Sequence, residues 1–503
     1  MPQLFLFCIG GTGARVLKSL LFLLASGVNI KARTIIPIIV DPDASNGDVE
    51  MAIEILQNYQ SIRQKIEPEK EGFFATNVQS LGSLNSDTNE GNSSNFGISK
   101  SFKWDIDGTR EGLFRRFISY DTMDPIDQSM TNLLFSEQNL NAELAVGFKG
   151  NPHMGSVVLN QMKNSKEFQF FASRFNENDR VFVVSSIFGG TGAAGFPLLV
   201  KNIREADDTL SSHQRLANAP IGAITVTPYF GIEPDKSIAI DKNTFIAKTK
   251  AALEYYDKNL SGNNSINALY YIGDTVSRDY KPAEGKREQR NDAHVIELVS
   301  SLAIIDFMNI DNTQLSTIEG KAETPIYKEY GIINGKDRQL NFRNLGATSR
   351  SQIAKNLTQY AYALNYWKNH LKTAIDKPAN WARSKKVPFS HDFMQSSFFT
   401  QHFTTFNNRF QSWLMEMSTN ERGFRPFDLM TSSPSTLVLS YEQMKKNLLG
   451  QSVPDRWDYS YFDAQLDEVE KKLQDFSPEK RFLTLFYYAT QAIINDKLKE
   501  LTK

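Results

Sequence analysis

The sequence predicts an α/β protein with a mostly parallel, doubly wound sheet, followed by a largely helical C-terminal region. Short apolar runs rich in β-branched residues recur as far as about residue 310. Each run is followed by a polar turn and then by apolar residues at helical spacing. This alternation is typical of a parallel sheet covered by helices on both faces. After residue 348 helical spacing dominates instead, which indicates a change of architecture.

The first strand–helix–strand unit is predicted near the N-terminus. Residues 4–9 form an apolar run that ends at a glycine, and residues 14–25 follow with the pattern of an amphipathic helix. Residues 34–40 are β-branched and end at Asp41 and Asp43. Later strands are predicted at residues 180–185, 221–227 and 268–272.

A chain of 503 residues exceeds what one hydrophobic core usually supports, so several domains are expected. We predict a first domain at residues 1–310 with an insertion at about 44–144, a connecting segment at 311–348, and a mainly helical domain at 349–503. The predicted helices of the last region are rich in aromatic residues and separated by proline-containing breaks: residues 353–371, 396–417, 441–449 and 461–502.

Composition narrows the classes of protein. Lys and Arg total 56 against 57 for Asp and Glu, so no general attraction to nucleic acid or anionic membranes is expected. The single cysteine, Cys8, excludes an internal disulfide and suits a reducing compartment. The longest apolar run, residues 20–28, is well short of the ~20 residues that span a bilayer. A cytoplasmic protein without a transmembrane segment is therefore expected.

The first candidate site is the turn Gly10-Gly11-Thr12-Gly13, between a predicted strand and a predicted helix. Glycines let the backbone pass close to phosphate oxygens, and a helix N-terminus offers unpaired N–H groups. The turn is no Walker P-loop, because Gly-Lys-Ser/Thr is missing, and it lacks the third glycine of a dinucleotide fingerprint. On its own, a tight turn without any ligand explains it equally well.

A second turn of the same kind, Gly189-Gly190-Thr191-Gly192, follows the predicted strand at residues 180–185. Two such turns can hold a ligand with two or three phosphates from both sides, whereas a dinucleotide fold does not need the second. The Thr191 hydroxyl is predicted to contact phosphate.

The second turn resembles the glycine-rich signature GGGTGTG or GGGTGSG of the tubulin/FtsZ superfamily. Gly189 to Gly192 match that signature, and three neighbours depart from it: Phe188, Ala193 and Ala194. The resemblance covers residues 3 to about 310 and is nearest to divergent bacterial tubulin-like proteins, because residues 44–144 exceed the corresponding stretch of FtsZ. It implies GTP or GDP, with Mg²⁺, as the bound ligands.

Other segments then match in the expected order. Gly150 and Asn151 belong to GFKGNPHMG, which resembles the GAGxNPxxG loop around the terminal phosphate in FtsZ-like proteins. Asp41 and Asp43 lie where the superfamily has a loop near the γ-phosphate and its Mg²⁺, and Mg²⁺ takes carboxylate oxygens as ligands. A solvated β-turn is the alternative for these two aspartates.

The resemblance also implies a ribose and base side. Residues 226–233 resemble the TxPFxFEG segment, which implicates Thr227 and Glu233, although an ordinary surface glutamate is an equal alternative. Asn291, at the start of a long apolar pattern, is the nearest match to the asparagine that reads the base. Its amide can pair with guanine, which favours GTP, and a helix N-cap is the alternative role.

The resemblance implies a GTP-binding protein that self-assembles into cytoskeletal filaments. In the superfamily an acidic loop of the neighbouring subunit assists hydrolysis, and positioning of this kind dominates phosphoryl transfer. The sequence has no clean copy of that loop; Asp337 is the nearest candidate for a weak GTPase activity, and a plain surface loop is the alternative.

Two further hypotheses stay open. The helical region departs from the superfamily's second domain, so the chain could be a non-polymerising nucleotide-binding scaffold that docks a protein partner through these helices. An NAD-dependent enzyme using the Gly11-x-Gly13 turn is a weaker alternative, because it leaves the turns at Gly150 and Gly190 unexplained.

Overall fold

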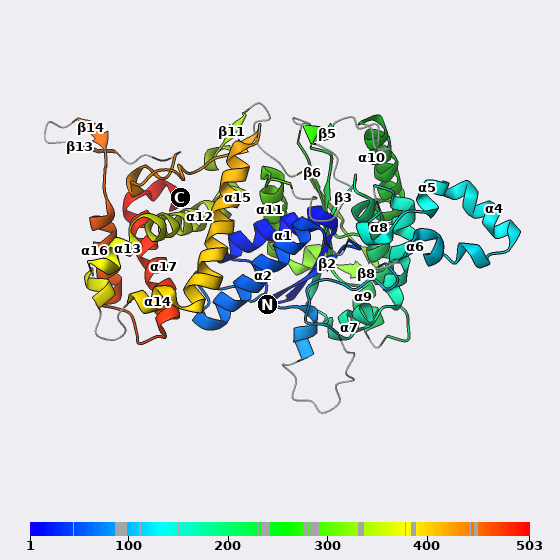
Figure 1. The fold of residues 1–503 in the computed structure, drawn as a ribbon, viewed down its shortest axis with the longest axis horizontal. Coiled ribbons are helices and arrows are strands. Elements are labelled where there is room, and N and C mark those ends of the chain that lie inside the picture. The colour runs from blue at the N-terminus through cyan, green and yellow to red at the C-terminus, as the bar shows by residue number, and fades with distance from the viewer. Residues whose placement is uncertain are drawn as a thin grey trace.

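A six-stranded sheet, parallel throughout, forms the middle of the computed structural model (Figure 1). The strand order is β10-β6-β4-β3-β1-β2, with β1 (Gln3–Ile9), β2 (Thr34–Val40), β3 (Arg180–Ser186), β4 (Ile221–Val226), β6 (Ala268–Ile272) and β10 (Ile326–Glu329). The structure describes residues 1–43, 45–85, 98–109, 112–148, 150–210, 212–229, 231–232, 242–274, 279–280, 291–329, 337–377, 379–383, 389–439, 441, 444–446 and 451–502. The predicted α/β class with a parallel sheet is confirmed.

Helices precede, follow and cover these strands. They are α1 (Gly10–Ala25), α2 (Gly47–Ile66), α3 (Phe114–Phe117), α4 (Pro125–Leu134), α5 (Glu137–Leu140), α6 (Pro152–Leu159), α7 (Lys166–Arg174), α8 (Gly190–Arg204), α9 (His213–Ala217), α10 (Lys242–Tyr256), α11 (Val295–Asn309), α12 (Ala347–Asn369), α13 (Leu371–Asp376), α14 (His391–Gln395), α15 (Thr404–Thr419), α16 (Tyr459–Glu470) and α17 (Pro478–Lys497). Short strand pairs are β5 (Gly231–Ile232) with β7 (Asp279–Tyr280), β8 (Thr317–Ile318) with β9 (Lys321–Ala322), β11 (Gln339–Leu340) with β12 (Gly423–Phe424), and β13 (Met444–Lys446) with β14 (Ser452–Pro454).

The strand order reverses between β1 and β3. From β1 the chain passes to β2 on one side, and all later strands of the sheet add on the other side. The outer edge of β2 is covered at two points, where Ile35 pairs with Val78 and Ile39 pairs with Lys103. Pro37 lies between these points, where its missing N–H leaves no donor unpaired. In such sheets ligands bind beyond the carboxyl ends of the strands at the point of reversal.

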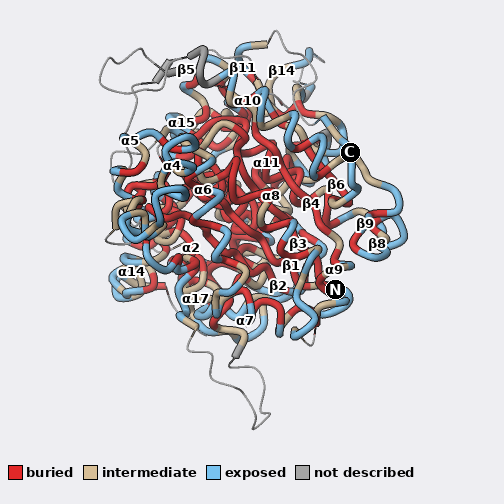
Figure 2. Tube along the Cα trace, turned by 90° about the vertical axis from the view of Figure 1, so that its right-hand side faces the viewer, coloured by how far each residue is buried: buried red, intermediate tan, exposed pale blue. Residues whose placement is uncertain are grey.

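Each face of the sheet has its own hydrophobic core, because alternate side chains of a strand point to opposite faces. On β1, Phe5, Phe7 and Ile9 pack with α6, α7, α8 and α10. Leu4, Leu6 and Cys8 point the other way and pack with α1, α2 and α11. Figure 2 shows this buried interior running through the middle of the molecule.

The C-terminal helices extend the second of these cores rather than building a separate one. Phe406, Phe410 and Trp413 of α15 surround Phe22 of α1 with ring centroids 5.2 to 5.4 Å apart. The Trp413 indole also donates a hydrogen bond to Ser19 Oγ at 2.9 Å. With the sheet on one side and α15 on the other, every residue of α1 except Gly11 is buried. The expected amphipathic helix is therefore a helix buried on all sides.

Several predicted boundaries differ from the structure. The predicted helix at 441–449 is wrong, because residues 444–446 form β13 and pair with β14. The predicted helix at 461–502 is two main helices, α16 and α17, with a break at 471–477. The connecting segment at 311–348 supplies β10, which completes the sheet beside β6. Within the described residues no helix is long and apolar enough to cross a membrane.

Candidate functional site

The two glycine turns lie side by side at the carboxyl edge of the sheet. The first leads from β1 into α1, and the second leads from the neighbouring β3 into α8. A Cβ added to Gly10 would lie only 3.7 Å from Thr191 Cβ and 3.9 Å from the Gly192 backbone nitrogen. Two helices of 16 and 15 residues therefore begin next to each other at the point of strand reversal. Helix N-termini attract anions through unpaired N–H groups and their positive dipole ends.

The third turn, around Gly150 and Asn151, lies against the second turn. A Cβ added to Gly190 would lie 3.1 Å from the Asn151 backbone nitrogen and 3.2 Å from the Gly150 nitrogen. Asn151 is the N-cap of α6, because its Oδ1 accepts the His153 N–H at 3.1 Å. The side-chain oxygen of Asn151 thus stabilises the start of α6, and this helix N-terminus joins the other two. The structure brings the turns near residues 10, 150 and 190 together.

Two of the predicted site glycines, Gly13 and Gly192, are required by packing within the protein. A Cβ on Gly13 would lie 2.4 Å from the Cys8 carbonyl carbon, and one on Gly192 would lie 2.6 Å from the Ser186 carbonyl oxygen. Both positions therefore need glycine so that a helix can approach the end of its own strand. Two other glycines of these turns have different structural reasons: Gly10 has a φ of +70°, which favours glycine, and a Cβ on Gly190 would lie 3.0 Å from Phe148 Cβ.

The two threonines of the turns differ in access. Thr12 is buried, whereas Thr191 is half-buried. Thr191 is thus the hydroxyl with the better access to a bound group.

Asp41 and Asp43 lie at the same edge, directly after β2. They are only 4% and 2% exposed, so the alternative of a solvated turn is wrong. Asp41 accepts hydrogen bonds from the Asp43 N–H at 2.9 Å and the Asn46 amide at 3.2 Å. Burial, together with the Asp43 charge, raises the pKa of Asp41 to about 7. The Lys103 ammonium donates to the Asp43 carbonyl oxygen at 2.5 Å.

This carboxylate pair fits Mg²⁺ only in company with other ligands. Mg²⁺ is commonly held by one or two carboxylates and by phosphate oxygens of a substrate. The described residues include no group of three or more His, Cys, Asp and Glu that could hold a metal by itself. The two carboxylates therefore suit a metal ion that is bound together with a polyphosphate.

A buried ionic cluster lies directly behind the first turn. Arg15 of α1 contacts Asp48 of α2 and Glu297 of α11, each at 3.0 Å, and donates to the Tyr229 hydroxyl at 2.9 Å. All four residues are at most 5% exposed. One guanidinium thus connects the helices after β1 and β2, the loop after β4, and the start of α11.

Burial shapes the protonation of this cluster. It raises the pKa of Glu297 to about 7, against the opposing charges of Lys18 and Arg15. The His294 ring contacts that of Tyr229 in a tilted arrangement, with ring centroids 4.8 Å apart. Burial lowers the pKa of His294 to about 4, with Arg15 and Arg422 acting in the same direction. A cluster this well buried is costly unless each charge keeps its partner, so it fixes the geometry behind the turn.

Lys248 of α10 lies at the third turn. Its Nζ donates to the Gly150 carbonyl oxygen at 2.8 Å, and burial lowers its pKa. Neither Lys248 nor the Arg15 cluster was among the site residues expected from the sequence. The charged residues Arg15, Lys18 and Glu297 within otherwise apolar helices were a usable signal, whereas nothing in the sequence links Lys248 to Gly150.

The structure describes two of the three residues that were predicted to contact the ribose and the base. The Thr227 hydroxyl donates to the Ile272 carbonyl oxygen at 3.3 Å and so joins the ends of β4 and β6. Asn291 is half-buried. Its predicted place at the start of the long helix is wrong, and so is the alternative that it is the N-cap of this helix. α11 begins at Val295, and its N-cap is His294, whose Nδ1 accepts the Ile296 N–H at 3.2 Å. Glu233 lies outside the described residues.

The C-terminal region holds this side of the site in place. The Ala293 N–H donates to Glu416 Oε2 at 2.9 Å, and the Asn420 amide donates to the Ala293 carbonyl oxygen at 2.6 Å. Arg422 forms a 2.6 Å ion pair with Asp274, which follows β6. The segment before α11 is therefore positioned by residues more than a hundred positions later in the chain.

Asp337, the candidate for catalysis in a neighbouring subunit, is held by its own chain. Its carboxylate accepts a hydrogen bond from the Asn344 amide at 2.8 Å, just before α12. This contact gives Asp337 a local structural role.

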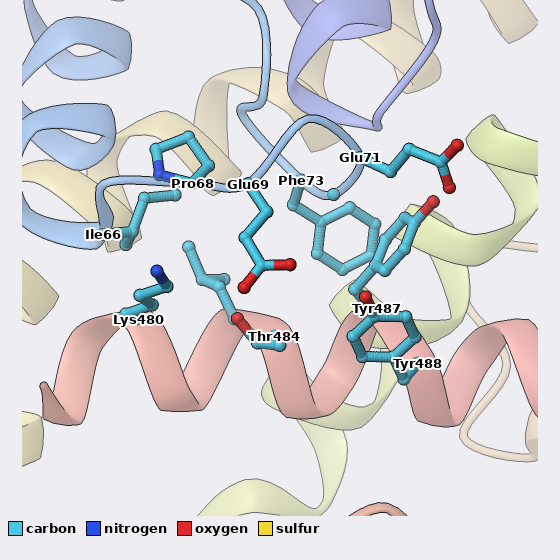
Figure 3. Close-up of a pocket in the computed structure, with 11 residues that line it drawn as sticks. Ile66, Pro68, Glu69, Glu71, Phe73, Lys480, Thr484, Tyr487 and Tyr488 are labelled. Atoms are coloured by element: carbon cyan, nitrogen blue, oxygen red, sulfur yellow. The ribbon is translucent and has the colours of Figure 1, made fainter. Parts of the chain in front are cut away.

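A pocket also lies away from the glycine turns, between the loop after α2 and α17 (Figure 3). Figure 3 shows Glu69 and Glu71 on the loop, opposite side chains of α17. The residues labelled there are Ile66, Pro68, Glu69, Glu71, Phe73, Lys480, Thr484, Tyr487 and Tyr488. None of the predicted site residues lines this pocket.

Comparison with known proteins adds no relative. No family model matches the sequence, and a search of curated proteins finds no significant match. The function of the chain must therefore be inferred from the geometry of the carboxyl edge.

Proposed function

We propose that the carboxyl edge of the sheet binds a nucleotide polyphosphate, with GTP or GDP and Mg²⁺ as the first choice. The observation that carries the proposal is the meeting of three glycine turns, each at a helix N-terminus, at the point of strand reversal. A structural turn needs no such convergence, whereas a chain of two or three phosphates offers acceptors for several sets of backbone N–H groups at once.

Each part of the edge has a role in this proposal. The backbone around Gly10, Gly11 and Gly190 and the Thr191 hydroxyl bind phosphate oxygens. Lys248 supplies positive charge and stabilises the Gly150 turn. Mg²⁺ would be held by Asp41 and Asp43 and would neutralise phosphate charge.

The choice of guanine depends on the resemblance to the tubulin/FtsZ superfamily, and so does self-assembly into filaments. In this proposal Thr227 and Glu233 lie on the ribose side, and the Asn291 amide forms hydrogen bonds with the base. A second copy of the chain covers the nucleotide, and any GTPase activity is weak.

The alternative is a non-polymerising nucleotide-binding scaffold. The contact between Asp337 and Asn344 favours it, because this carboxylate is engaged within its own chain. In that case the nucleotide stabilises a fixed shape, and a protein partner docks on the C-terminal helices.

The decisive experiment identifies the bound nucleotide. Full-length protein is purified, denatured, and the released nucleotide is separated by anion exchange beside GTP, GDP, ATP and NAD standards. We expect GDP or GTP. Recovery of NAD would favour the NAD-dependent enzyme over a site for a nucleoside di- or triphosphate, and ATP would contradict only the guanine assignment. A chain that releases no nucleotide and binds none of the four in solution would overturn the proposal.

Variants then locate the site. Thr191→Ala should weaken nucleotide affinity about three- to tenfold through the loss of one hydrogen bond to phosphate. Thr373→Ala, an exposed threonine of α13, is the matched control and should leave affinity unchanged. Gly190→Trp should abolish binding, but its side chain meets the Gly150 turn, so folding is checked by circular dichroism. Equal affinity in wild type and Thr191→Ala would contradict the placement of the phosphates.

Light scattering and pelleting separate the two functions. Assembly that requires GTP and is lost with GDP supports the filament. A protein that binds GTP and stays monomeric with every nucleotide supports the scaffold.

A further inference from the structure

Residues 113–144 form an arm that projects from the body of the protein. The arm contains α3, α4 and α5, and Figure 1 shows α4 and α5 reaching beyond the helices that cover the sheet. Its two ends are joined by the bridge between Leu113 and Glu143 and by the ring contact of Phe114 with Phe135 at 4.9 Å, and Phe114 and Leu144 are buried in the core that contains α6 and α7. The arm is thus a distinct surface that leads, after Leu144, into the turn around Gly150.

Helix α4 of this arm has an apolar face without a partner. Ile126, Met130, Leu133 and Leu134 are 75%, 58%, 84% and 70% exposed. Their spacing of four, three and one residues places them on one side of the helix. None of the ten residues of α4 is buried. Large apolar side chains gathered on one exposed face mark an interaction surface.

The helix is well formed in spite of this exposure. Asp124 caps it by accepting the N–H groups of Ile126 and Asp127, both at 2.9 Å, and Pro125 occupies its first turn. An isolated helix of ten residues is marginal in water, because most helix stability comes from packing of the apolar face. The apolar face of α4 therefore lacks the packing that usually stabilises such a helix.

The arm contains two cations, Arg115 and Arg116, both before α4, and the rest of its charge is negative. Residues 117–148 contain no Lys, Arg or His. The acidic residues of this stretch are Asp121, Asp124, Asp127, Glu137 and Glu143. Asp121 is paired with Arg115 at 2.6 Å. Two copies packed antiparallel through α4 would bring Asp124 and Asp127 toward Glu137 of the second copy, and like charges repel. The same charges disfavour nucleic acid and anionic lipid surfaces.

We propose that α4 docks into a basic-rimmed apolar groove of a different protein. The four apolar side chains fill the groove, as in other helix-in-groove contacts, and Lys or Arg residues at its rim pair with the acidic residues of the arm. No residue of the proposed nucleotide site takes part in this contact. It gives the insertion a function of its own, the attachment of a basic partner.

The test uses a probe of matching chemistry with full-length protein. The probe is a fluorescent amphipathic helical peptide of about 18 residues built from Leu and Lys, and a peptide of Leu and Glu is its control. Fluorescence anisotropy should detect binding of the Lys peptide and not of the Glu peptide. Affinity should fall when salt rises from about 50 mM to about 200 mM.

Variants assign the binding to α4. The double variant Ile126→Asp/Leu133→Asp should weaken binding at least about tenfold. Asp127→Asn should weaken it about twofold to threefold and reduce its salt dependence. Met430→Asp, at another exposed apolar residue, is the matched control and should bind like wild type. Circular dichroism checks that each variant is folded.

Three outcomes would overturn the proposal. The first is equal binding of the Leu/Glu peptide, and the second is wild-type affinity in the double variant. The third is concentration-dependent dimerisation of wild type that the double variant abolishes, which would make a second copy of the chain the occupant of this face.

Discussion

The two glycine turns begin with the same five residues, Gly-Gly-Thr-Gly-Ala, at positions 10–14 and 189–193, yet their surroundings differ. In α1 the next residue is Arg15, the centre of a buried ionic cluster that reaches α2 and α11. In α8 the corresponding residue is Ala194, and a Cβ on Gly155 of α6 would lie 2.9 Å from Ala194 Cβ. The start of α1 is thus held by a buried ionic cluster, and the start of α8 by close apolar packing.

This difference indicates how the two turns are connected to the rest of the molecule. The Arg15 cluster involves Tyr229, His294 and Glu297, and the segment before α11 is bonded to the C-terminal region through Glu416. The second turn contacts the turn around Gly150. The two turns share a sequence, but the first is coupled to the C-terminal half whereas the second is coupled to its neighbouring loop.

The largest effect is expected at Arg15. Arg15→Ala leaves Asp48 and Glu297 buried without their cation, which should lower the free energy of unfolding by about 3–5 kcal/mol. Urea denaturation measures the change. Lys201→Ala on α8 removes one half of an exposed pair and should change stability by less than about 0.5 kcal/mol. Similar losses in the two variants would contradict the contrast between the helices.

A second large effect concerns pH. The folded pKa of His294 is lowered to about 4, whereas the unfolded chain binds a proton at about 6.5. Between these values the unfolded state holds more protons, so the His294 contribution to stability falls as pH falls, by about 3 kcal/mol in total. His294→Asn keeps an N-cap acceptor for the Ile296 N–H and should remove this contribution.

The readout is the difference in unfolding free energy between wild type and His294→Asn at about pH 7 and about pH 5. Asp41 and Glu297 have raised pKa values near 7 and act in the opposite direction, but they do so in both proteins. A difference that stays constant with pH would show that His294 titrates normally in the folded state.

Paired glycine substitutions compare the turns directly. Gly13→Ala and Gly192→Ala each drive a methyl group into the end of a strand and should cost about 1–3 kcal/mol. Gly346→Ala is the control, because no atom lies within 4 Å of its added Cβ, and it should cost less than about 1 kcal/mol. Thermal unfolding measures all three. If only one of the two turn variants were destabilised, the turns would not share their packing constraint.

The smallest effect is expected at Lys248. Lys248→Met removes the bond to the Gly150 carbonyl and the positive charge beside the third turn, so nucleotide affinity should fall about three- to tenfold. Lys250→Met changes an exposed lysine of the same helix and should leave affinity unaltered. Equal affinity in both variants would remove Lys248 from the site.

The sequence by itself determined five of the six strands of the sheet, the turns after them and their parallel arrangement, whereas β10 was not predicted. These features depend on local periodicity and glycine placement, which short stretches encode. Residues 34–40 and 268–272 form strands as predicted, whereas 444–446 form a strand where a helix was expected. That short segment pairs with residues 452–454, and such a contact between separate strands overrides local propensity.

Only the tertiary structure decided which residues meet. The Arg15 cluster and the bond from Lys248 to Gly150 join residues far apart in the chain, such as Asp48 and Glu297 around one guanidinium. The burial of Asp41 and Asp43 likewise depends on the packing of the whole chain. The start of α11 at Val295 depends on His294, which contacts Tyr229, and on Ala293, which is bonded to Glu416 and Asn420. Periodicity predicts which face of an element is buried, but the partner buried against it depends on how the whole chain packs.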